Sequence, residues 1–346
     1  MTYLTQDEKR ETRALWEEVF PEDSESFNDY YYTEKIKNNR IMAVREGSEI
    51  VSMLHLNPYR VMVKNQIWRC EYIVGVGTKA SKRRQGHMRT MLTGMLEDLY
   101  QEGRQFCFLM PADPAIYAPF DFTYIFDQPH WKLKQGTDIE KVSYDLEKGS
   151  EHHPVQELAD WMNMWLHNQY EVYVFRDYAY IETLLKELRS EQGELNLLYN
   201  EDRLVGIECL WGIKEKEQRM LLCETPYREE ERPAVPAIMA RIVNLENFIK
   251  VIRLKRGCGK EELCVNLMVE DNLCRGNAGN WRWYIKSTGS VLERIEDSQM
   301  AGAEASRLKI TIRDLTSWLF GYQTPEEGSW MDLIQPLKGV FLDEVV

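Results

Sequence analysis

The alternation of apolar and polar residues divides the first hundred residues into helices, strands and one strand-loop-helix unit. Apolar residues recur at helical spacing over residues 5–20 and again from Ser24 to Lys37. A period of two follows over residues 41–74, interrupted at Glu46-Gly47-Ser48, which predicts a hairpin and further antiparallel strands. The expected order is therefore two helices, antiparallel strands, and then a strand, a loop and a longer helix.

The stretch from Ile73 to Leu92 contains the most informative of these transitions. An apolar run leads into a basic loop with Arg83-Arg84-Gln85-Gly86, and apolar residues then recur at helical spacing. A helix that begins in such a loop points unpaired N–H groups and its positive dipole end at the loop, and glycine lets a ligand approach the backbone. This arrangement suits a pyrophosphate, although an Arg-Arg pair alone is more typical of a solvated basic patch. The nucleoside-triphosphate and dinucleotide glycine patterns are both absent.

A second segment favours the ligand-binding interpretation. Residues 106–113 have the pattern of an apolar strand that ends in a turn, and Ile116-Tyr117-Ala118-Pro119-Phe120 follows. Arg-x-x-Gly after an apolar strand resembles the coenzyme-A pyrophosphate loop of the Gcn5-related N-acetyltransferases (GNATs). Together the two segments resemble the Eis (enhanced intracellular survival) group of acetyltransferases.

The resemblance implies a site for acetyl-CoA, used as the acyl-donor substrate. The backbone of Val76, Gly77 and Thr78 would hold the pantetheine arm. Ala112 and Asp113 would lie along the cofactor. The loop that would bind the pyrophosphate consists of Arg84, Gln85, Gly86, His87, Met88 and Arg89.

The same resemblance implies two catalytic residues. Tyr117 falls where the family places its general acid, near the departing thiolate, and the alternative is a packed tyrosine whose hydroxyl is satisfied. The base would be the terminal carboxylate of the chain, here that of Val346, and burial would raise its pKa toward useful basicity. Asp343 and Glu344 are rival carboxylates at the same end.

Two blocks of the first part recur later in the chain, which indicates an internal repeat. Phe27–Tyr32 is echoed by Phe175–Tyr180, and Ile41–Leu56 can be laid on Leu195–Leu210 without a gap. Both copies predict a helix followed by a hairpin. The later copy has neither Arg-x-x-Gly nor a long helix after the hairpin, so we expect a degenerate acetyltransferase domain that cannot bind the cofactor.

The remaining residues predict an α+β unit. Ile238–Leu245 is expected to lead a helix that ends at about Ile252. The strands and the final helix expected after it cover Leu263–Val269, Trp281–Ile285, Ser290–Glu293, Leu308–Ile312 and Asp314–Phe320. Their order resembles the sterol-carrier-like third domain of the Eis group.

The whole chain is therefore expected to be α+β with mixed sheets: tandem GNAT domains, the second degenerate, followed by a sterol-carrier-like domain. Changes in composition near Lys132–Gly136 and over the charged, proline-containing Arg228–Pro236 predict the boundaries. We expect an acetyl-CoA-binding domain over residues 1–133 and a degenerate domain over 134–232. The sterol-carrier-like domain would cover 233–346 and end in the active site.

The composition limits which partners the protein is expected to bind and in which cellular compartment it is expected to lie. The formal net charge of −13 disfavours nucleic acid and anionic membranes and favours cationic amines, although acidity equally serves solubility. The seven cysteines form no Cys-x-x-Cys motif and are expected to be reduced core thiols, and His152-His153 are expected to be loop residues, so we expect no metal. With no membrane-length apolar run and no signal-peptide pattern, we expect a cytoplasmic protein that does not insert into membranes.

We therefore expect an N-acetyltransferase that moves acetyl groups directly from acetyl-CoA to primary amines of a cationic small molecule, such as an aminoglycoside or a polyamine. Two alternatives remain open: a protein lysine or N-terminal acetyltransferase, and a non-catalytic lipid- or acyl-binding protein with a vestigial acetyltransferase domain. The aromatic residues Trp16, Phe27 and Tyr30–Tyr32 either shape a cleft or, as we favour, form a core face. The resemblance also implies a homo-oligomer, a hexamer.

Overall fold

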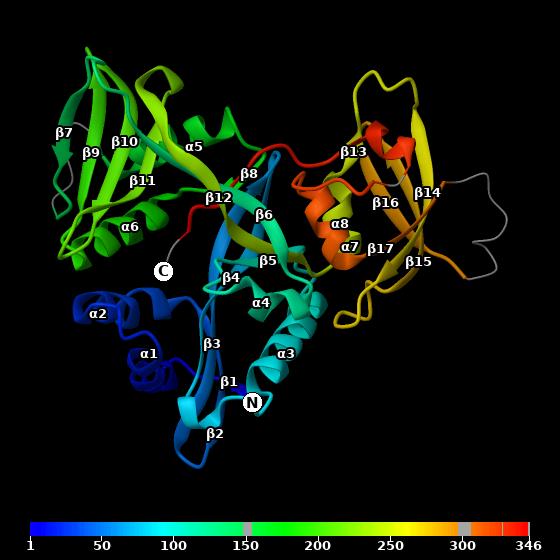
Figure 1. Cartoon of the computed structure of the whole chain (residues 1–346), viewed down its shortest axis with the longest axis horizontal. Helices are drawn as coiled ribbons and strands as arrows, with labels where there is room; N and C mark the ends of the chain where they lie inside the picture. The colour runs from blue at the N-terminus through cyan, green and yellow to red at the C-terminus, as the bar shows by residue number, and fades with distance from the viewer. Residues whose placement is uncertain (148–153, 297–305, 327, 345–346) are drawn as a thin grey trace.

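The computed structural model describes residues 1–147, 154–296, 306–326 and 328–344. The chain forms three units arranged along the long axis of the molecule (Figure 1). The first unit lies in the middle, and the second and third units lie at opposite ends. None of the helices in the described ranges is long and apolar enough to cross a membrane.

The first unit is built on a large sheet with the strand order β1-β2-β3-β4-β5-β12-β6. Along this path neighbouring strands are antiparallel, except β4 and β5, which are parallel. The hairpin predicted around Glu46-Gly47-Ser48 is confirmed as β2 and β3. The strands are β1 (Thr2–Tyr3), β2 (Arg40–Glu46), β3 (Glu49–Val63), β4 (Gln66–Thr78), β5 (Phe106–Leu109), β6 (Thr123–Leu133) and β12 (Arg228–Ile242).

The helices of the first unit are α1 (Arg13–Val19), α2 (Glu25–Thr33), α3 (His87–Gln101) and α4 (Pro114–Tyr117). The helix expected after the basic loop is α3, whose apolar side is fully buried against the sheet. The aromatic residues of α1 and α2 are buried, as the core interpretation predicted, and the rings of Trp16 and Tyr31 lie 4.4 Å apart.

The second unit repeats the topology of the first. Its sheet has the order β11-β10-β9-β7, formed by β7 (Glu140–Tyr144), β9 (Glu194–Asn200), β10 (Arg203–Trp211) and β11 (Glu217–Cys223). Its helices are α5 (Val155–His167) and α6 (Tyr178–Ser190). The predicted helix and hairpin are confirmed as α6, β9 and β10. After β11 the chain makes one short 3-10 turn and enters β12, so this copy has no counterpart of α3.

One part of the predicted repeat is wrong in register. Phe27–Tyr32 lies inside α2, whereas Phe175 and Arg176 precede α6. The capping residues show the true correspondence: the Ser24 side chain accepts a hydrogen bond from the third N–H of α2, and the Asp177 side chain does the same for α6. The two aromatic blocks are therefore not structural equivalents.

Strand β12 corrects the expectation of a helix that begins at Ile238. The charged stretch Arg228–Pro236 is the first half of this long strand and pairs with β6, and Ile238–Ile242 continues it between β5 and β6. The apolar run there is buried on both faces of the sheet, and such a run cannot be distinguished from a buried helix by periodicity alone. The helical turns begin only at α7 (Leu245–Phe248).

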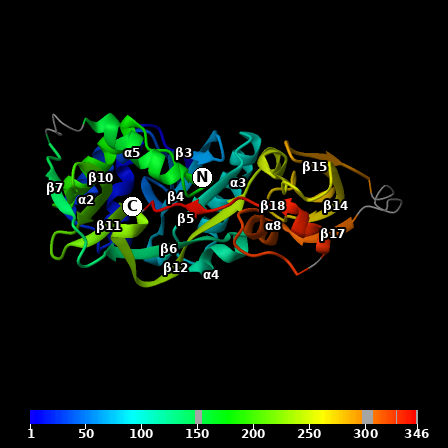
Figure 2. The same ribbon diagram turned by 90° about the horizontal axis from the view of Figure 1, so that it is seen from above.

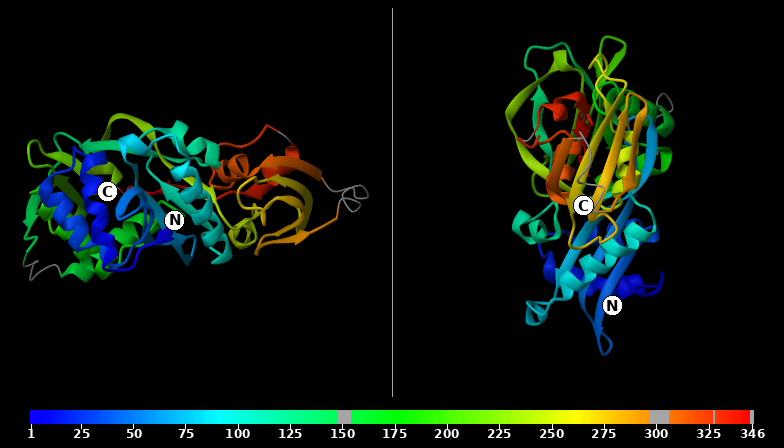
Figure 3. Two further views of the ribbon diagram at one scale, coloured as in Figure 1. Left: turned by 90° about the horizontal axis from the view of Figure 1, so that it is seen from below. Right: turned by 90° about the vertical axis from the view of Figure 1, so that its right-hand side faces the viewer.

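The third unit is a sheet of order β16-β15-β14-β17 packed against α8. The predicted strands are confirmed as β14 (Glu262–Glu270), β15 (Gly279–Lys286), β16 (Gly289–Arg294) and β17 (Ser306–Thr311), and the final helix as α8 (Ile312–Leu319). Figure 3 shows this sheet from two further directions. The edge-to-face contact of Trp283 with Trp318, 6.0 Å between ring centroids, joins the sheet to α8.

The C-terminal segment returns from the third unit to the middle of the molecule. After β18 (Ile334–Gln335), which pairs with β13 (Arg253–Leu254), the chain runs along the molecule to β19 (Val340–Phe341) (Figure 2). β19 pairs in parallel with β8 (Val172–Val174), and β8 pairs with β3 of the large sheet. The division into residues 1–133, 134–232 and 233–346 stays a prediction, and its second boundary falls inside β12.

Candidate active site

The parallel strands β4 and β5 separate after a short stretch of pairing. They pair only at Glu71 with Cys107 and at Tyr72 with Phe108, while β4 continues to Thr78. Within the described ranges, no strand pairs with this edge of β4 beyond Tyr72. The backbone of Val76–Thr78, predicted to hold the pantetheine arm, therefore lies on an edge of β4 without a described strand partner, where the carbonyls of Gly77 and Thr78 accept side-chain hydrogen bonds from Ser52 and Arg83.

A glycine bends β4 just before this edge. Gly75 has φ +58°, and a side-chain carbon placed on it would lie 2.3 Å from the ring of Trp16. Opposite it, the pairing passes from Met53 with Gly77 to His55 with Val74, so β4 carries an extra residue here. Such a bulge turns the following residues and needs glycine at the left-handed position.

The predicted pyrophosphate loop leads directly into α3. Gly86 occupies the N-cap with φ +84°, no side chain caps the helix, and the space where a Cβ of Gly86 would lie is open. The first N–H groups of α3 and its positive dipole end therefore face a site that a phosphate can reach.

The cationic side chains of this loop differ in whether they form ion pairs. Lys79 and Lys82 form ion pairs with Glu49 and Glu46. Arg84 is exposed, has φ +63°, and forms no ion pair with any described residue. Arg83 is likewise exposed and forms no ion pair with a described residue, but its Nε donates a hydrogen bond to the Thr78 carbonyl. Arg84 is thus a loop cation whose guanidinium is available to an anion.

The remaining loop residues are less uniform. Gln85 is exposed, whereas His87 and Met88 are half-buried, and Met88 packs against the core. The guanidinium of Arg89 lies 5.2 Å from the centre of the Phe120 ring, a cation–π contact. The described structure therefore brings Arg84–Arg89 together at one helix start, with Arg84, Gln85 and Arg89 exposed and His87 and Met88 half-buried.

The segment after β5 carries the other predicted residues. Ala112 and Asp113 are exposed, and the Asp113 carboxylate caps α4 by accepting a hydrogen bond of 2.9 Å from Ala115 N–H. Tyr117 closes α4, and its ring meets the edge of Phe122 at 6.1 Å between centroids. Burial raises the pKa of Tyr117 to about 12. The Tyr117 hydroxyl has no hydrogen-bond partner among the described residues. A tyrosine with a packing role alone would be expected to have its hydroxyl hydrogen-bonded.

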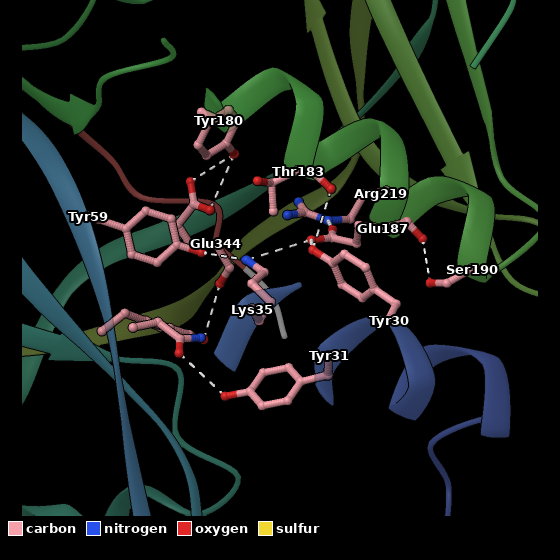
Figure 4. Close-up of polar contacts among 12 residues, drawn as sticks. Tyr30, Tyr31, Lys35, Tyr59, Tyr180, Thr183, Glu187, Ser190, Arg219 and Glu344 are labelled. Atoms are coloured by element: carbon pink, nitrogen blue, oxygen red, sulfur yellow. Dashed lines mark hydrogen bonds and ion pairs between the residues drawn. The ribbon is translucent and has the colours of Figure 1, made fainter. Parts of the chain in front are cut away.

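The rival carboxylates are both held by arginine. Arg176 donates one hydrogen bond to Glu344 Oε1 and one to Asp343 Oδ1, both at 2.5 Å. The hydroxyl of Tyr180 adds a bond of 3.1 Å to Glu344 (Figure 4). Burial alone would raise the pKa of Glu344, but the nearby Arg176 and Arg219 lower it below its ordinary value. A carboxylate with a lowered pKa is a weak base. Val346, the predicted base, lies outside the described residues.

The tail nevertheless reaches the point where β4 and β5 separate. The hydroxyl of Tyr72 donates a hydrogen bond of 3.2 Å to the backbone carbonyl of Glu344. Burial raises the pKa of Tyr72 most, Glu344 raises it further, and Tyr117 is also close enough to contribute. Tyr72 therefore connects the described end of the chain with the neighbourhood of Tyr117.

A pocket of about 420 Å³ lies beside the tail, between the first and second units. Its wall includes Lys35, Tyr59, Tyr180, Glu187 and Glu344, which Figure 4 draws together. Lys35 donates a hydrogen bond of 3.1 Å to the hydroxyl of Tyr59 and lies 3.9 Å from Glu187. Aromatic rings, carboxylates and one lysine therefore line the pocket and could contact a polar ligand.

Sequence reasoning missed the residues that hold the tail. Arg176 and Tyr180 belong to the block Phe175–Tyr180, whose repeat pattern rests on its aromatic residues, and Glu187 and Arg219 carry no local motif. The described residues contain no cluster of His, Cys, Asp and Glu suited to a metal ion, and His152-His153 lie outside the described residues.

Comparisons with known proteins agree with this architecture. Residues 1–125 match the family model of the acetyltransferase (GNAT) domain, and residues 246–344 match that of the sterol carrier protein domain. Comparison with curated protein sequences gives no match.

Solved structures match the chain over nearly its whole length. A probable N-acyltransferase from Enterococcus faecalis has a TM-score of 0.73 at 15% identity and covers 98% of both chains. A GCN5-related N-acetyltransferase from Anabaena variabilis has a TM-score of 0.72 at 16% identity, covering 97% of this chain and 94% of its own. Eis1 from Mycobacterium abscessus has a TM-score of 0.67 at 10% identity, covering 99% and 100%.

At these identities the solved structures establish the fold, and the family models establish the domains. The resemblance of the sequence to the Eis group is thereby confirmed, as are the α+β class and the tandem arrangement. The chain has an Eis-like fold with an N-terminal domain of the GNAT acetyltransferases, a family of acetyl-CoA-dependent N-acetyltransferases, and a C-terminal sterol carrier protein domain.

Proposed function

We propose that the protein transfers the acetyl group of acetyl-CoA directly to a primary amine of a cationic small molecule. The observation that carries this proposal is the meeting of three features at the separation of β4 and β5: the unpaired edge of β4, the start of α3 with Arg84, and Tyr117. Binding both reactants in one cleft makes the reaction effectively unimolecular.

The residues present fit acetyl-CoA. The edge from Val76 to Thr78 offers backbone groups to the amides of the pantetheine arm. The N–H groups at the start of α3 and the unpaired Arg84 suit the pyrophosphate, and the open space at Gly86 allows its approach. Ala112 and Asp113 line the opposite side of the cleft in this proposal.

The chemical step needs one proton acceptor and one proton donor. The neutral amine attacks the thioester carbonyl, the tetrahedral intermediate collapses, and the carbon–sulfur bond breaks. The carboxylate of Val346 accepts the proton that the amine loses, and the Tyr117 hydroxyl gives a proton to the departing thiolate. Tyr117 suits this role because burial keeps its pKa at about 12, so the phenol stays protonated at neutral pH.

Val346 is the preferred base because its rivals are engaged elsewhere. Asp343 and Glu344 are both bound by Arg176, and the pKa of Glu344 is lowered. The hydrogen bond from Tyr72 to Glu344 supports a route for the last residues toward the cleft.

We propose that the acceptor amine enters through the pocket beside the tail. Its aromatic and carboxylate lining fits a polar amine, and the net charge of −13 favours the approach of cations. Aminoglycosides and polyamines are the classes proposed, a hexamer is proposed from the Eis resemblance alone, and the expected cytoplasmic location stays a prediction.

A panel of acceptors tests the proposal. The protein is incubated with acetyl-CoA and neomycin, spermine or lysine-containing peptides, and products are identified by mass. Acetylated neomycin or spermine is the expected product. Acetylation of the peptides alone would favour a protein acetyltransferase, and tight binding of a fatty acid without any acetyl transfer would favour the acyl-carrier alternative.

A further inference from the structure

The described C-terminal residues are buried, whereas the last residues of most chains are poorly ordered. Val340–Glu344 all lie in the interior, and β19 is held by β8. A terminus is ordered in this way only when specific contacts hold it. The contacts that hold it come largely from the second unit.

Arg176 supplies the strongest of these contacts. It follows β8, is completely buried, and lies 4.4 Å from the centre of the Tyr180 ring. Its two terminal nitrogens bond separately to Asp343 and Glu344. A buried arginine without carboxylate partners is strongly unfavourable, so the carboxylates of the tail stabilise the buried charge of Arg176, and Arg176 in turn holds the tail.

Arg219, on β11, holds the same segment from the other side. Its Nη1 donates a hydrogen bond of 3.0 Å to the backbone carbonyl of Asp343, and its Nε donates one of 2.9 Å to Glu187. Glu187 on α6 also accepts a bond of 3.4 Å from Tyr30 on α2. The contacts of Arg219 therefore join the second unit, the tail and the first unit.

We propose that Arg176 and Arg219 are positioning residues that clamp the C-terminal tail, and that this is the role of the second acetyltransferase unit in catalysis. That unit lacks a counterpart of α3 but keeps α6, which Arg176 shortly precedes, and β11, which carries Arg219. The clamp places Glu344 against Tyr72 at the separation of β4 and β5. The catalytic part of this inference rests on the proposed function of Val346.

Digestion with a carboxypeptidase tests the clamp without any acceptor substrate. In the wild-type protein we expect digestion to stop before Glu344, because Asp343 and Glu344 are buried. In Arg176→Gln we expect it to continue through both residues, as read by intact mass. The matched control is Arg203→Gln in the same unit, which removes an exposed ion pair with Glu224 and should leave digestion unchanged.

Kinetics then test whether the clamp acts through the tail. With spermine or neomycin as acceptor, Arg176→Gln should lower kcat on the order of 100-fold, as expected for misplacement of a catalytic group. The affinity for acetyl-CoA should not change. In protein lacking residues 345–346 the same substitution should have no further effect on kcat. Arg176→Lys should recover part of the activity because it keeps the charge.

If Arg176→Gln does not fold, the variant Tyr180→Phe provides a second test of the clamp. It removes the hydroxyl that bonds to Glu344 and keeps the ring that packs on Arg176. It should lower kcat in the full-length protein and not in the truncated one.

Three outcomes distinguish the clamp on the tail from the proposed role of Val346 as the base. Identical digestion of wild type and Arg176→Gln would overturn the clamp. An equal loss of kcat in the full-length and truncated proteins would overturn its action through the tail. Release of the tail by Arg176→Gln, together with full activity of the truncated protein, would keep the clamp and reject Val346 as the base.

Discussion

The hydroxyl of Tyr72 donates a hydrogen bond to the backbone carbonyl of Glu344, although the two residues are 272 positions apart in the sequence. Tyr72 belongs to the last pair that joins β4 to β5, and Glu344 is the last residue that the structure describes. This bond brings the end of the chain to the edge of the proposed acetyl-CoA cleft. It thereby brings the last described residue to the strand pair that precedes the proposed acid, Tyr117.

The lowered pKa of Glu344 predicts that acid weakens the docking of the tail. A carboxylate whose pKa is depressed in the folded state contributes stability that is present above its ordinary pKa. That contribution is lost as the pH falls through the folded value. At pH 7, Glu344→Gln should lower the free energy of unfolding by about 1.5–3 kcal/mol, the value of a hydrogen bond to a charged group.

Urea unfolding at several pH values measures this effect. The gap between wild type and Glu344→Gln should begin to shrink as the pH falls below about 4, where the unfolded chain takes up a proton at this carboxylate while the folded protein, with its lowered pKa, still holds it charged. Glu224→Gln, at an exposed pair with Arg203, should show little difference at any pH. A gap for Glu344→Gln that stays constant down to pH 2.5 would contradict the assigned ion pair.

Arg84 and Lys82 should differ in their effect on acetyl-CoA binding. Lys82 is paired with Glu46, whereas Arg84 forms no ion pair with a described residue. Arg84→Ala should weaken binding about 10- to 100-fold, because it removes a charged hydrogen-bond donor to the pyrophosphate. Lys82→Ala should change it little. Calorimetric titration with acetyl-CoA compares the two, and equal losses would argue against Arg84 as the pyrophosphate ligand.

Tyr117→Phe should lower kcat by roughly 100-fold or more, the usual contribution of a general acid. Acetyl-CoA should still bind with its normal affinity. Because the pKa of Tyr117 is raised to about 12, the wild-type phenol keeps its proton throughout pH 6–10, and kcat should show no basic decline in that range from this group. A pH profile of kcat for both proteins is the measurement, and a Tyr117→Phe variant of full activity would assign Tyr117 to packing.

A buried ion pair connects the third unit to the segment that carries Tyr117. Arg241 on β12 bonds to Asp271 at 2.6 Å and to the backbone carbonyl of Phe120 at 2.9 Å, and both charged side chains are buried. Asp271→Asn should lower the free energy of unfolding by about 3–5 kcal/mol, since it leaves the buried Arg241 with only the more distant Asp121, at 3.9 Å, as a counter-charge.

The matched control is the neighbouring residue Glu270, which forms an exposed pair with Lys309. Glu270→Gln should change stability by no more than about 0.5 kcal/mol in the same urea titration. If the two variants were equally stable, the pair between Arg241 and Asp271 would not anchor this segment.

Local pattern was enough to predict the parts of the fold that depend on neighbours in sequence. The hairpin at Glu46-Gly47-Ser48 and the helix after Gly86 follow from periodicity and turn chemistry. Strand β12 was missed because a strand buried on both faces has no alternation, and its partners β5 and β6 lie about a hundred residues earlier.

The residues of the candidate site also divide into those that the local sequence indicates and those that depend on distant parts of the chain. The loop from Arg84 to Arg89 could be predicted because its chemistry lies in one continuous stretch. Arg176 and Arg219 could not, because each acquires its role only when the tail returns between the first and second units. Nothing in the sequence near either arginine indicates Asp343 or Glu344 as its partner.

The measurement that tests the central claim most directly is acetyl transfer by the protein ending at Val346, compared with the same protein lacking Val346. A third protein with one glycine added after Val346 displaces the carboxylate without removing the side chain. We predict that both changes lower kcat by at least 100-fold, in line with loss of a general base, while the affinity for acetyl-CoA is kept. Full activity in either altered protein would contradict the account.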